Sequence, residues 1–500
     1  MSHAAPYPTF ALPHRELRVT VGELTTDTGA VGHVVFDGEA PPEITGLSAA
    51  RAAELGFTPK VGSTLVLVAG DDPVTVLLGG GDRAAADATA LRNIAAHLAR
   101  AVPHQEHLAL RVPETAIPVA DAMAALVEGA ALARYVYRIG EDGPEAKLSS
   151  LALLAEPGDD AAAGIARGQL TVRATKLARD LGGTPGGMLT ATRFGEVALD
   201  LGVKAGLEVT VVGEDELVEL GCGGLLGINL GSVEPPVMIK LVYRPDGEPA
   251  GKLALVGKGI MYDAGGLALK PGDEVHAVMK NDMSGAGAIF AAMTVLGELG
   301  CRAQVTGYLM CTDNMPSGSA LRLGDIVVMR GGKTVEVVNT DAEGRMVMGD
   351  ALVLATEEPV DAIIDVATLT GAALRTLGTE IAAVLGNDEA LLDRVKASAE
   401  RTDEPVWELP LAHRYRSELD SPLADLRNMG GANAGTITAA LFLEEFVAGK
   451  PWAHIDIAGT AQSWSASGWR NNGVTGFGAR LLIDLALNFS VGHTVERTAR

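Results

Sequence analysis

The chain has 500 residues, 47% of them hydrophobic, and its 63 Asp and Glu outnumber its 40 Lys and Arg, which gives a formal net charge of −23. An apolar fraction near one half excludes a disordered chain, and the length predicts two or three domains. Nucleic acid binding depends on Lys and Arg that neutralise phosphates, so this acidity weighs against a nucleic acid partner.

Cysteine use and apolar runs bear on the cellular compartment. The cysteines, at 222, 301 and 311, are too few and too scattered for a disulfide framework or a cysteine zinc site, and they fit a reducing compartment. The first residues show no basic segment followed by an apolar one, and no apolar run reaches ~18 residues. We therefore expect a cytoplasmic protein without a signal peptide or a membrane segment.

Residues 1–160 have the pattern of a small α/β domain. Short apolar runs predict strands and longer periodic stretches predict helices, at 17–21, 64–68 and 74–78 for strands and at 84–101 and 120–133 for helices. The glycines at 79–81 followed by Asp82 predict a turn, and a phosphate-binding loop is the weaker alternative. The Pro-Gly and acidic residues at 156–160 predict the domain boundary, and 161–182 predicts a linking helix.

Residues 183–500 alternate strands with helices, which predicts a catalytic α/β domain whose mixed, largely parallel sheet is flanked by helices. The predicted strands are 208–212, 237–243, 253–256, 304–309, 362–366 and 453–457, and the predicted helices are 286–299, 344–356, 389–401 and 437–447. Ligands of such sheets bind at the carboxyl ends of the strands, where we expect the functional residues.

The larger domain lacks the signatures of several enzyme classes: H-E-x-x-H, G-x-S-x-G and G-x-x-x-x-G-K-[ST] are all absent. It does carry charged residues in Gly-rich, apolar surroundings. Lys258, Asp263 and Lys270 are the only charges in VGKGIMYDAGGLALK, whose glycines allow a ligand to approach the backbone. A salt-bridged strand end is the alternative interpretation of this segment.

Two further segments place carboxylates at predicted helix starts. MKNDMSGAG contributes Asp282, and NTDAEGR contributes Asp341 and Glu343 after a predicted hairpin at 325–338. Helix capping is the alternative for both segments. Asp341 and Glu343 are two positions apart, so in an extended loop they point the same way and repel each other unless a cation lies between them.

The three segments together predict a metal site. Four carboxylates at strand ends suit divalent cations that prefer oxygen ligands. A pair of bridged cations lowers the pKa of a bound water and stabilises a tetrahedral transition state. Lys270 and Arg345 beside such a site would be costly unless an anion, bound or developing, is also present.

These segments resemble the leucyl aminopeptidase (M17 cytosol aminopeptidase) family. NTDAEGR is the signature of that family, although Met346 follows it here in place of the usual Leu. The resemblance extends to DVATLTGA, GTITAAL and WAHIDIAG and covers roughly residues 165–490. It implies two divalent metal ions per subunit, zinc or manganese with magnesium as a further candidate, whose ligands would be Lys258, Asp263, Asp282, Asp341 and Glu343.

The same resemblance implies roles for the remaining residues. Lys270 would polarise the scissile carbonyl, and Arg345 would hold a bicarbonate ion that acts as general base. The substrate would be held by residues that line the first side-chain pocket and bind its backbone, namely Met279, Asn339, Thr368, Leu369 and Gly371.

The predicted function is therefore a metal-dependent aminopeptidase that acts on peptides with apolar N-terminal residues such as leucine. The family resemblance also implies a homohexamer. The alternative from another class is a DNA-binding or regulatory hexamer of the same fold, with or without catalysis, against which the net charge and the complete metal set argue. Another two-metal hydrolase, such as a phosphoesterase, is the enzymatic alternative, but it would not predict Lys258 as a ligand or an anion at Arg345.

Overall fold

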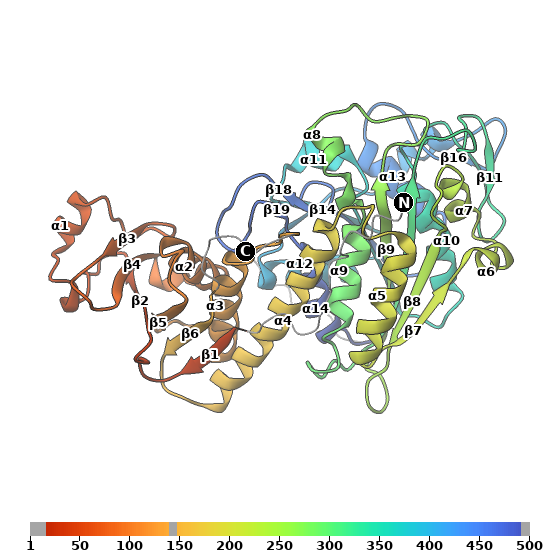
Figure 1. Ribbon diagram of the computed structural model, residues 1–500. Coiled ribbons are helices and arrows are strands. Elements are labelled where there is room, and N and C mark those ends of the chain that lie inside the picture. The colour runs from red at the N-terminus through yellow and green to blue at the C-terminus, as the bar shows by residue number, and fades with distance from the viewer. Residues whose placement is uncertain (1–16, 140–147, 492–500) are drawn as a thin grey trace, which may run out of the picture. The chain divides into compact units, whose positions relative to one another are not determined.

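A computed structural model describes residues 17–139 and 148–491 (Figure 1). The described chain forms two compact units, each treated separately below: 177–462 with 474–491, and 17–176 with 463–473. The two-domain α/β architecture predicted from the sequence is confirmed. The predicted boundaries at 160 and 182 stay predictions; both fall near the ends of one long helix, α4 (Asp159–Gly183).

The smaller unit is built on a six-stranded sheet in the order β1-β6-β5-β2-β4-β3. Its strands are parallel except for the antiparallel pair β3 and β4. The bounds are β1 (Arg18–Val21), β2 (Ala30–Phe36), β3 (Thr64–Leu67), β4 (Val74–Gly81), β5 (His107–Arg111) and β6 (Ser150–Leu154), with helices α1 (Ala49–Glu54), α2 (Ala88–Ala101) and α3 (Val119–Ala133). Asp87 caps α2 by accepting a hydrogen bond from the Ala90 backbone.

The predicted glycine turn at 79–82 is wrong, because Gly79–Gly81 continue strand β4. A Cβ atom at Gly79 would lie 2.0 Å from the carbonyl oxygen of Lys60, and one at Gly80 would lie 2.7 Å from Phe36. These glycines let β4 pack closely against Lys60 and Phe36. The turn begins only at Asp82, which caps a short 3-10 helix at Arg83–Ala85.

A distant segment completes the smaller unit. Residues 463–473 belong to it, and Trp469 in that segment is 1% exposed within its hydrophobic core. Arg100 on α2 donates hydrogen bonds to the carbonyl of Gly468 at 2.8 Å and to the side chain of Asn471 at 2.6 Å. The N-terminal fold therefore uses chain that lies more than 300 positions downstream.

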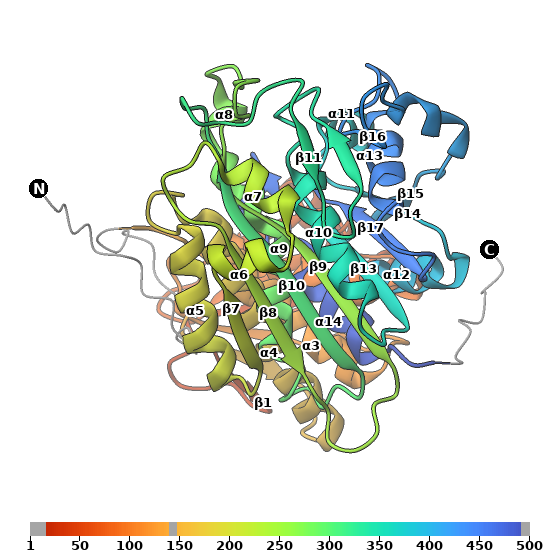
Figure 2. The ribbon, with the colours of Figure 1, turned by 90° about the vertical axis from the view of Figure 1, so that its right-hand side faces the viewer.

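The larger unit contains an eight-stranded sheet in the order β15-β14-β17-β13-β9-β10-β8-β7. The four central strands, β17, β13, β9 and β10, are parallel, whereas β8, β7 and β14 introduce antiparallel pairs. Figure 2 shows β9, β10, β8 and β7 side by side. The bounds are β7 (Glu208–Val212), β8 (Val237–Tyr243), β9 (Lys252–Asp263), β10 (Gln304–Asn314), β13 (Ala362–Ala367), β14 (Ala382–Gly386), β15 (Val406–Glu408) and β17 (Trp452–Asp456).

Helices pack against the sheet on both faces. One layer contains α9, α14, α5 and α12, and the other contains α10, α7 and α13. The bounds are α5 (Ala191–Lys204), α6 (Glu214–Glu219), α7 (Gly223–Asn229), α8 (Glu274–Ala277), α9 (Ser284–Met293), α10 (Gly344–Thr356), α11 (Gly371–Leu377), α12 (Glu389–Thr402), α13 (Gly435–Glu444) and α14 (Ala479–Leu487).

A small three-stranded sheet joins β11 (Ile326–Val328), β12 (Thr334–Glu336) and β16 (Leu426–Arg427), and β18 (Gln462–Ser463) pairs with β19 (Gly473–Val474). The predicted hairpin at 325–338 is confirmed by the antiparallel pairing of β11 and β12.

The central strand β9 is much longer than the predicted strand at 253–256. It runs to Asp263, so Lys258 lies inside the strand and not in a loop after it. A Cβ atom at Gly257 would lie 2.7 Å from the backbone of Ala286, so glycine lets helix α9 pack closely on the strand at this point. Gly257 and Gly259 therefore serve packing around the strand, whereas Gly265 and Gly266 lie in the turn that follows it.

Candidate metal centre

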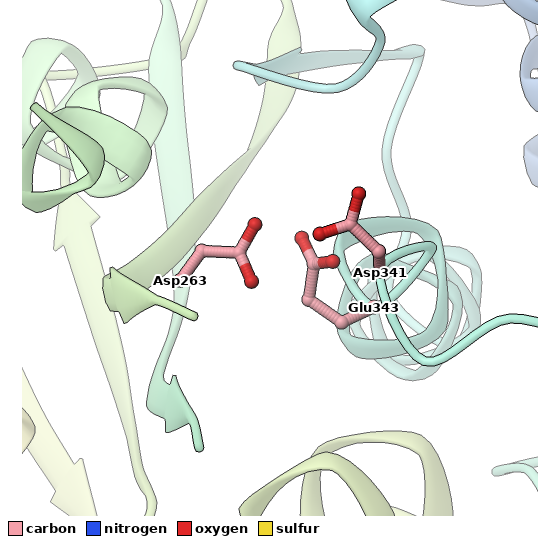
Figure 3. A group of neighbouring side chains, drawn as sticks. All are labelled: Asp263, Asp341 and Glu343. Carbon is pink, nitrogen blue, oxygen red and sulfur yellow. The ribbon is translucent and has the colours of Figure 1, made fainter. Parts of the chain in front are cut away.

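Three of the predicted carboxylates converge at the end of β9. Asp263 is the last residue of that strand, while Asp341 and Glu343 precede helix α10 in the loop that follows β12. One oxygen from each lies within 4.8 Å of one from each of the others. Figure 3 shows Asp263 facing Asp341 and Glu343. The sequence prediction that these side chains meet is consistent with this geometry.

Lys258 connects Asp282 to this group. Its ammonium lies 2.6 Å from Oε1 of Glu343 and 2.9 Å from Oδ2 of Asp282, and it donates a hydrogen bond to the Thr368 carbonyl at 2.9 Å. Asp282 comes from the 3-10 helix η3 (Met279–Met283), directly before α9. All four predicted carboxylates therefore belong to one charged network.

Lys270 forms two further ion pairs in this network. Its ammonium lies 2.7 Å from Oδ2 of Asp263 and 2.6 Å from Oδ1 of Asp341. Gly265 and Gly266 have positive φ angles of 89° and 61°, which turn the chain back after β9 and bring Lys270 over Asp263. The side chains of Lys270 and Asp341 are 18% and 35% exposed, so the network reaches solvent on this side.

The remaining members are almost completely buried: Lys258 and Asp263 are 2% exposed, Asp282 is 4% and Glu343 is 1%. Oε2 of Glu343 has no hydrogen-bond partner among the described residues. A buried, unpaired carboxylate oxygen is costly unless a cation or donor reaches it. Buried carboxylates with an unsatisfied oxygen and a spacing suited to shared coordination fit a divalent metal site.

The electrostatics of the network follow from burial opposed by ion pairing. Burial raises the pKa of Asp282 and Glu343; the ammonium of Lys258 lowers it, and the charge of Asp263 raises it further. Burial lowers the pKa of Lys258, but Asp282 and Glu343 more than offset this, so its pKa is raised overall. Lys258 is thus an ammonium in this arrangement. Acting as a metal ligand requires it to lose a proton, which a nearby dication favours.

Two buried asparagines that the sequence analysis missed hold the loops of the site. Asn314, at the end of β10, donates hydrogen bonds to Oδ1 of Asp263 and to the Thr340 carbonyl, each at 2.9 Å. Asn428, which is fully buried, accepts from the backbone of Val338 at 2.9 Å and donates to the Asn339 carbonyl at 2.6 Å. The available signal was positional, because Asn314 ends the strand next to β9.

Arg345 lies in the first turn of α10, is 6% exposed, and has no hydrogen-bond partner on Nε or Nη1 within the described chain. Burial lowers its pKa to about 10, although Glu343 and Asp456 oppose the shift. A buried guanidinium with free donors presents a binding position for an anion.

The predicted substrate residues lie on elements that touch the network. The Thr368 hydroxyl donates to Oδ1 of Asp282 at 2.7 Å, and Leu369 follows it in the same loop. Gly371 begins α11 and Met279 begins η3. Asn339 accepts a hydrogen bond from the backbone of Asp341 at 2.8 Å. The structure brings these residues to the same region of the unit.

Family models match both parts of the chain. The model of the catalytic domain of the cytosol aminopeptidase family covers residues 176–483, and the model of its N-terminal domain covers 36–139. A "probable cytosol aminopeptidase" of Streptomyces griseus subsp. griseus is 43% identical over 474 residues, which is 89% of this chain and 91% of the relative. The chain belongs to the cytosol aminopeptidase family.

Two further comparisons support this family assignment. A "probable cytosol aminopeptidase" of Chlorobium limicola is 45% identical over 348 residues, or 69% of each chain. The solved structure of the bottromycin maturation enzyme BotP in complex with Mn superposes with a TM-score of 0.84 at 37% identity, covering 93% of this chain and 99% of that one.

The prediction of a metal-dependent hydrolase of the aminopeptidase type is thereby confirmed at the level of the family. No helix within residues 17–139 and 148–491 combines the length and apolar character that crossing a membrane requires.

Proposed function

We propose that this member of the cytosol aminopeptidase family releases N-terminal amino acids from peptides with the aid of two divalent metal ions. Lys258, Asp263, Asp282, Asp341 and Glu343 would hold these ions. One observation carries the proposal, namely the buried network of four carboxylates with an unsatisfied oxygen on Glu343. Burying such a network costs free energy in the absence of metal ions, and its carboxylate oxygens are suitable ligands for them.

The ligand set favours zinc or manganese, with magnesium as a further candidate, because carboxylates and one amine suit these ions. The manganese in the BotP complex supports manganese as the first ion to test. When bound, the metals supply a Lewis acid and a water of lowered pKa. Every other catalytic task falls to side chains of the chain itself.

Lys270 would stabilise the negative charge that develops on the scissile carbonyl oxygen, since its ammonium is the more exposed of the two in the network. Arg345 would hold a bicarbonate ion that takes up the proton of the attacking water. The free donors of the buried Arg345 guanidinium support this role. A carboxylate that ligates a metal is poorly placed to act as a free base as well, which is why an added anion is proposed.

Substrate recognition would follow from the loops around the network. Met279, Asn339, Thr368, Leu369 and Gly371 would line the first pocket and hold the substrate backbone. The free amino group of the substrate would bind the metal near Lys258 and Asp282, which restricts cleavage to the N-terminal residue. Leucine and other apolar N-terminal residues are the proposed preference.

Two further proposals concern the cellular context. The chain is proposed to assemble as a homohexamer and to act in the cytoplasm, without nucleic acid or membrane partners. The names of its relatives as cytosol aminopeptidases support the compartment. The net charge of −23 argues against a DNA-binding role.

The deciding experiment is turnover of a panel of aminoacyl anilides by metal-free protein to which zinc, manganese or magnesium is added back. We expect activity only with metal, with leucine anilide among the best substrates and N-acetylated leucine anilide inert. Absence of turnover with every metal would contradict the proposal. Retarded DNA in a low-salt mobility shift without peptide turnover would favour the regulatory alternative, and hydrolysis of a phosphate ester alone would favour a phosphoesterase.

A further inference from the structure

The carboxylate of Asp456 lies close to the metal network but has no part in the chemistry proposed above. Asp456 ends strand β17 and is fully buried. Its Oδ1 accepts hydrogen bonds from the backbone of Leu369 at 3.2 Å, Thr370 at 3.3 Å and Ala458 at 3.1 Å, and its Oδ2 accepts one from the Thr370 hydroxyl at 2.6 Å. Backbone and hydroxyl donors thus satisfy a buried negative charge.

Three of these four donors belong to the loop between β13 and α11: the backbone N–H groups of Leu369 and Thr370 and the Thr370 hydroxyl. Asp456 pairs in register with Ala367, the last residue of β13, so its side chain reaches the loop that follows. Within that loop the Thr370 hydroxyl also caps α11 by accepting from the Ala373 backbone at 3.0 Å. It lies 3.0 Å from the Thr436 hydroxyl of α13 as well. The carboxylate of Asp456 therefore holds the backbone of this loop.

The other end of the same loop touches the metal network. The Thr368 carbonyl accepts from the Lys258 ammonium at 2.9 Å, and the Thr368 hydroxyl donates to Oδ1 of Asp282 at 2.7 Å. Thr368 directly precedes Leu369, whose backbone N–H is held by Asp456. A shift of the loop backbone would move the Thr368 contacts to two proposed metal ligands.

We propose that Asp456 is a positioning residue that fixes residues 368–371, so that Thr368 orients Lys258 and Asp282 while the loop presents its backbone to the substrate. The second half of this inference rests on the proposed function, whereas the first half concerns the loop alone. Asp456 touches neither substrate nor metal in this scheme and acts only through the loop.

The chemistry of the side chain separates its charge from its hydrogen bonds. In Asp456→Asn the remaining oxygen still accepts the three backbone N–H groups, and the new amide donates to the Thr370 hydroxyl, which in turn donates to Thr436. Asp456→Ala leaves these buried donors without an acceptor. A positioning role thus predicts rescue by asparagine and loss with alanine.

The test compares Asp456→Ala and Asp456→Asn in the full chain, with Asp388→Ala as the matched control. Asp388 also accepts from a helix backbone, that of Leu391 at 2.8 Å, but it caps α12 outside the loop. Hydrogen exchange of a peptide covering 366–372 is measured in the metal-free protein, where it does not depend on turnover. We expect exchange about tenfold faster in Asp456→Ala, and rates within about threefold of wild type in the other two variants.

Kinetics with leucine anilide provide the second readout. We expect KM to rise about tenfold or more in Asp456→Ala, with a smaller change in kcat, and to stay within about threefold of wild type in Asp456→Asn. A purely structural role would lower the folded fraction, and hence the apparent kcat, without changing KM, and it would speed exchange throughout the unit and not in 366–372 alone. Wild-type exchange and KM in Asp456→Ala would overturn the proposal.

A further variant keeps the proposal testable if Asp456→Ala fails to fold. Thr370→Val removes the donor to Oδ2 of Asp456 at nearly constant volume, and we expect a smaller change in the same direction for both exchange and KM. Unchanged values in this variant would count against the loop contact. Wild-type protein that shows no aminopeptidase activity would refute the proposed function, while the exchange result would still decide the role of Asp456.

Discussion

Each lysine of the metal network pairs with two carboxylates, but the two lysines differ in exposure. Lys258 is enclosed between Asp282 and Glu343 inside the sheet, whereas Lys270 bridges Asp263 and Asp341 where the network meets solvent. The proposed roles follow this difference: the buried lysine would act on the ligand set, and the more exposed one would act on a substrate. This difference allows the proposed catalytic role to be tested without dismantling the core.

Lys270→Ala is expected to lower kcat for leucine anilide by about 10² or more, because it removes a cation aimed at developing negative charge. The fold should persist, because the Lys270 side chain is 18% exposed and water can enter the space that the truncation opens. Lys240→Ala is the matched control, because Lys240 lies on β8, outside the network, and forms an ion pair with Glu358. Steady-state kinetics with thermal unfolding measure both effects, and wild-type turnover in Lys270→Ala would refute the assigned role.

Asp313 gives a prediction of how stability depends on pH. Burial raises the pKa of Asp313 to about 6, with a hydrogen bond from Ser232 opposing the shift. A carboxyl group whose pKa is higher when folded than when unfolded favours the folded state at low pH. Its contribution is lost as pH rises from about 4 through about 6.

Asp313→Asn should therefore stabilise the protein at pH 8 by up to about 3 kcal/mol, at ~1.4 kcal/mol per unit of pKa shift, and by less at pH 5. The amide oxygen can still accept the hydrogen bond from Ser232. Urea unfolding at the two pH values measures the difference. An equal effect at both values would show that ionisation of Asp313 does not limit stability.

At the scale of elements, close contact between α10 and β9 shapes the site. A Cβ atom at Gly344, in the first turn of α10, would lie 2.7 Å from Cδ and 2.8 Å from Nζ of Lys258. Glycine at this position therefore lets the helix approach the strand while Lys258 stays extended toward Asp282 and Glu343. The distance between helix and strand determines where the ammonium lies.

Gly344→Ala should separate stability from function. Alanine favours a helix over glycine by roughly 0.5–1 kcal/mol, so unfolding should change little. The displaced Lys258 should lower both metal bound per chain at equilibrium and leucine anilide turnover, the latter by about tenfold or more. Gly287→Ala in α9 is the control, because its added Cβ meets nothing closer than 3.4 Å. Full turnover and metal binding in Gly344→Ala would contradict this account.

Periodicity located most strands and helices of the larger unit, because their apolar faces repeat regularly. It stopped β9 at Val256, since a buried lysine between two glycines looks like a loop until the close packing of Gly257 on α9 and of Gly259 on β10 is known. The convergence of the four carboxylates was predictable because they stand in short motifs of distinctive spacing. Asn314 and Asn428 were missed because their contacts are made across long sequence separations and leave no local pattern. Asp456 stands in WAHIDIAG, but no role was assigned to it because the Leu369 backbone that it holds lies far away in the sequence.

For the whole molecule, the net charge of −23 has two distinct parts. Asp263, Asp282, Asp341 and Glu343 contribute four negative charges, and two lysine ammoniums pair with them inside the larger unit. The rest of the excess lies outside this network, where it opposes polyanionic partners. Most of the acidic residues therefore weigh against a polyanionic partner, and only four of them form the candidate metal site.

The smaller unit includes the distant segment 463–473, whose two tryptophans differ in burial. Trp469 and Trp464 lie in the same distant segment, 463–473, but Trp469 is 1% exposed in the core of the unit and Trp464 is 53% exposed. Trp469→Ala removes a large buried side chain and should lower the free energy of unfolding of this unit by about 3–5 kcal/mol. Trp464→Ala, the matched control, should change it by no more than about 0.5 kcal/mol.

Urea unfolding followed by circular dichroism measures both variants. If the segment merely covers the surface of the smaller unit, the two substitutions should have similar, small effects. The burial of Trp469 and the hydrogen bond from Arg100 to the Arg470 carbonyl indicate that the segment completes the core. In that case only Trp469→Ala should unfold the unit at a lower urea concentration. That result would also predict that the first 176 residues, expressed without the segment, form a less stable domain than the same residues in the full chain.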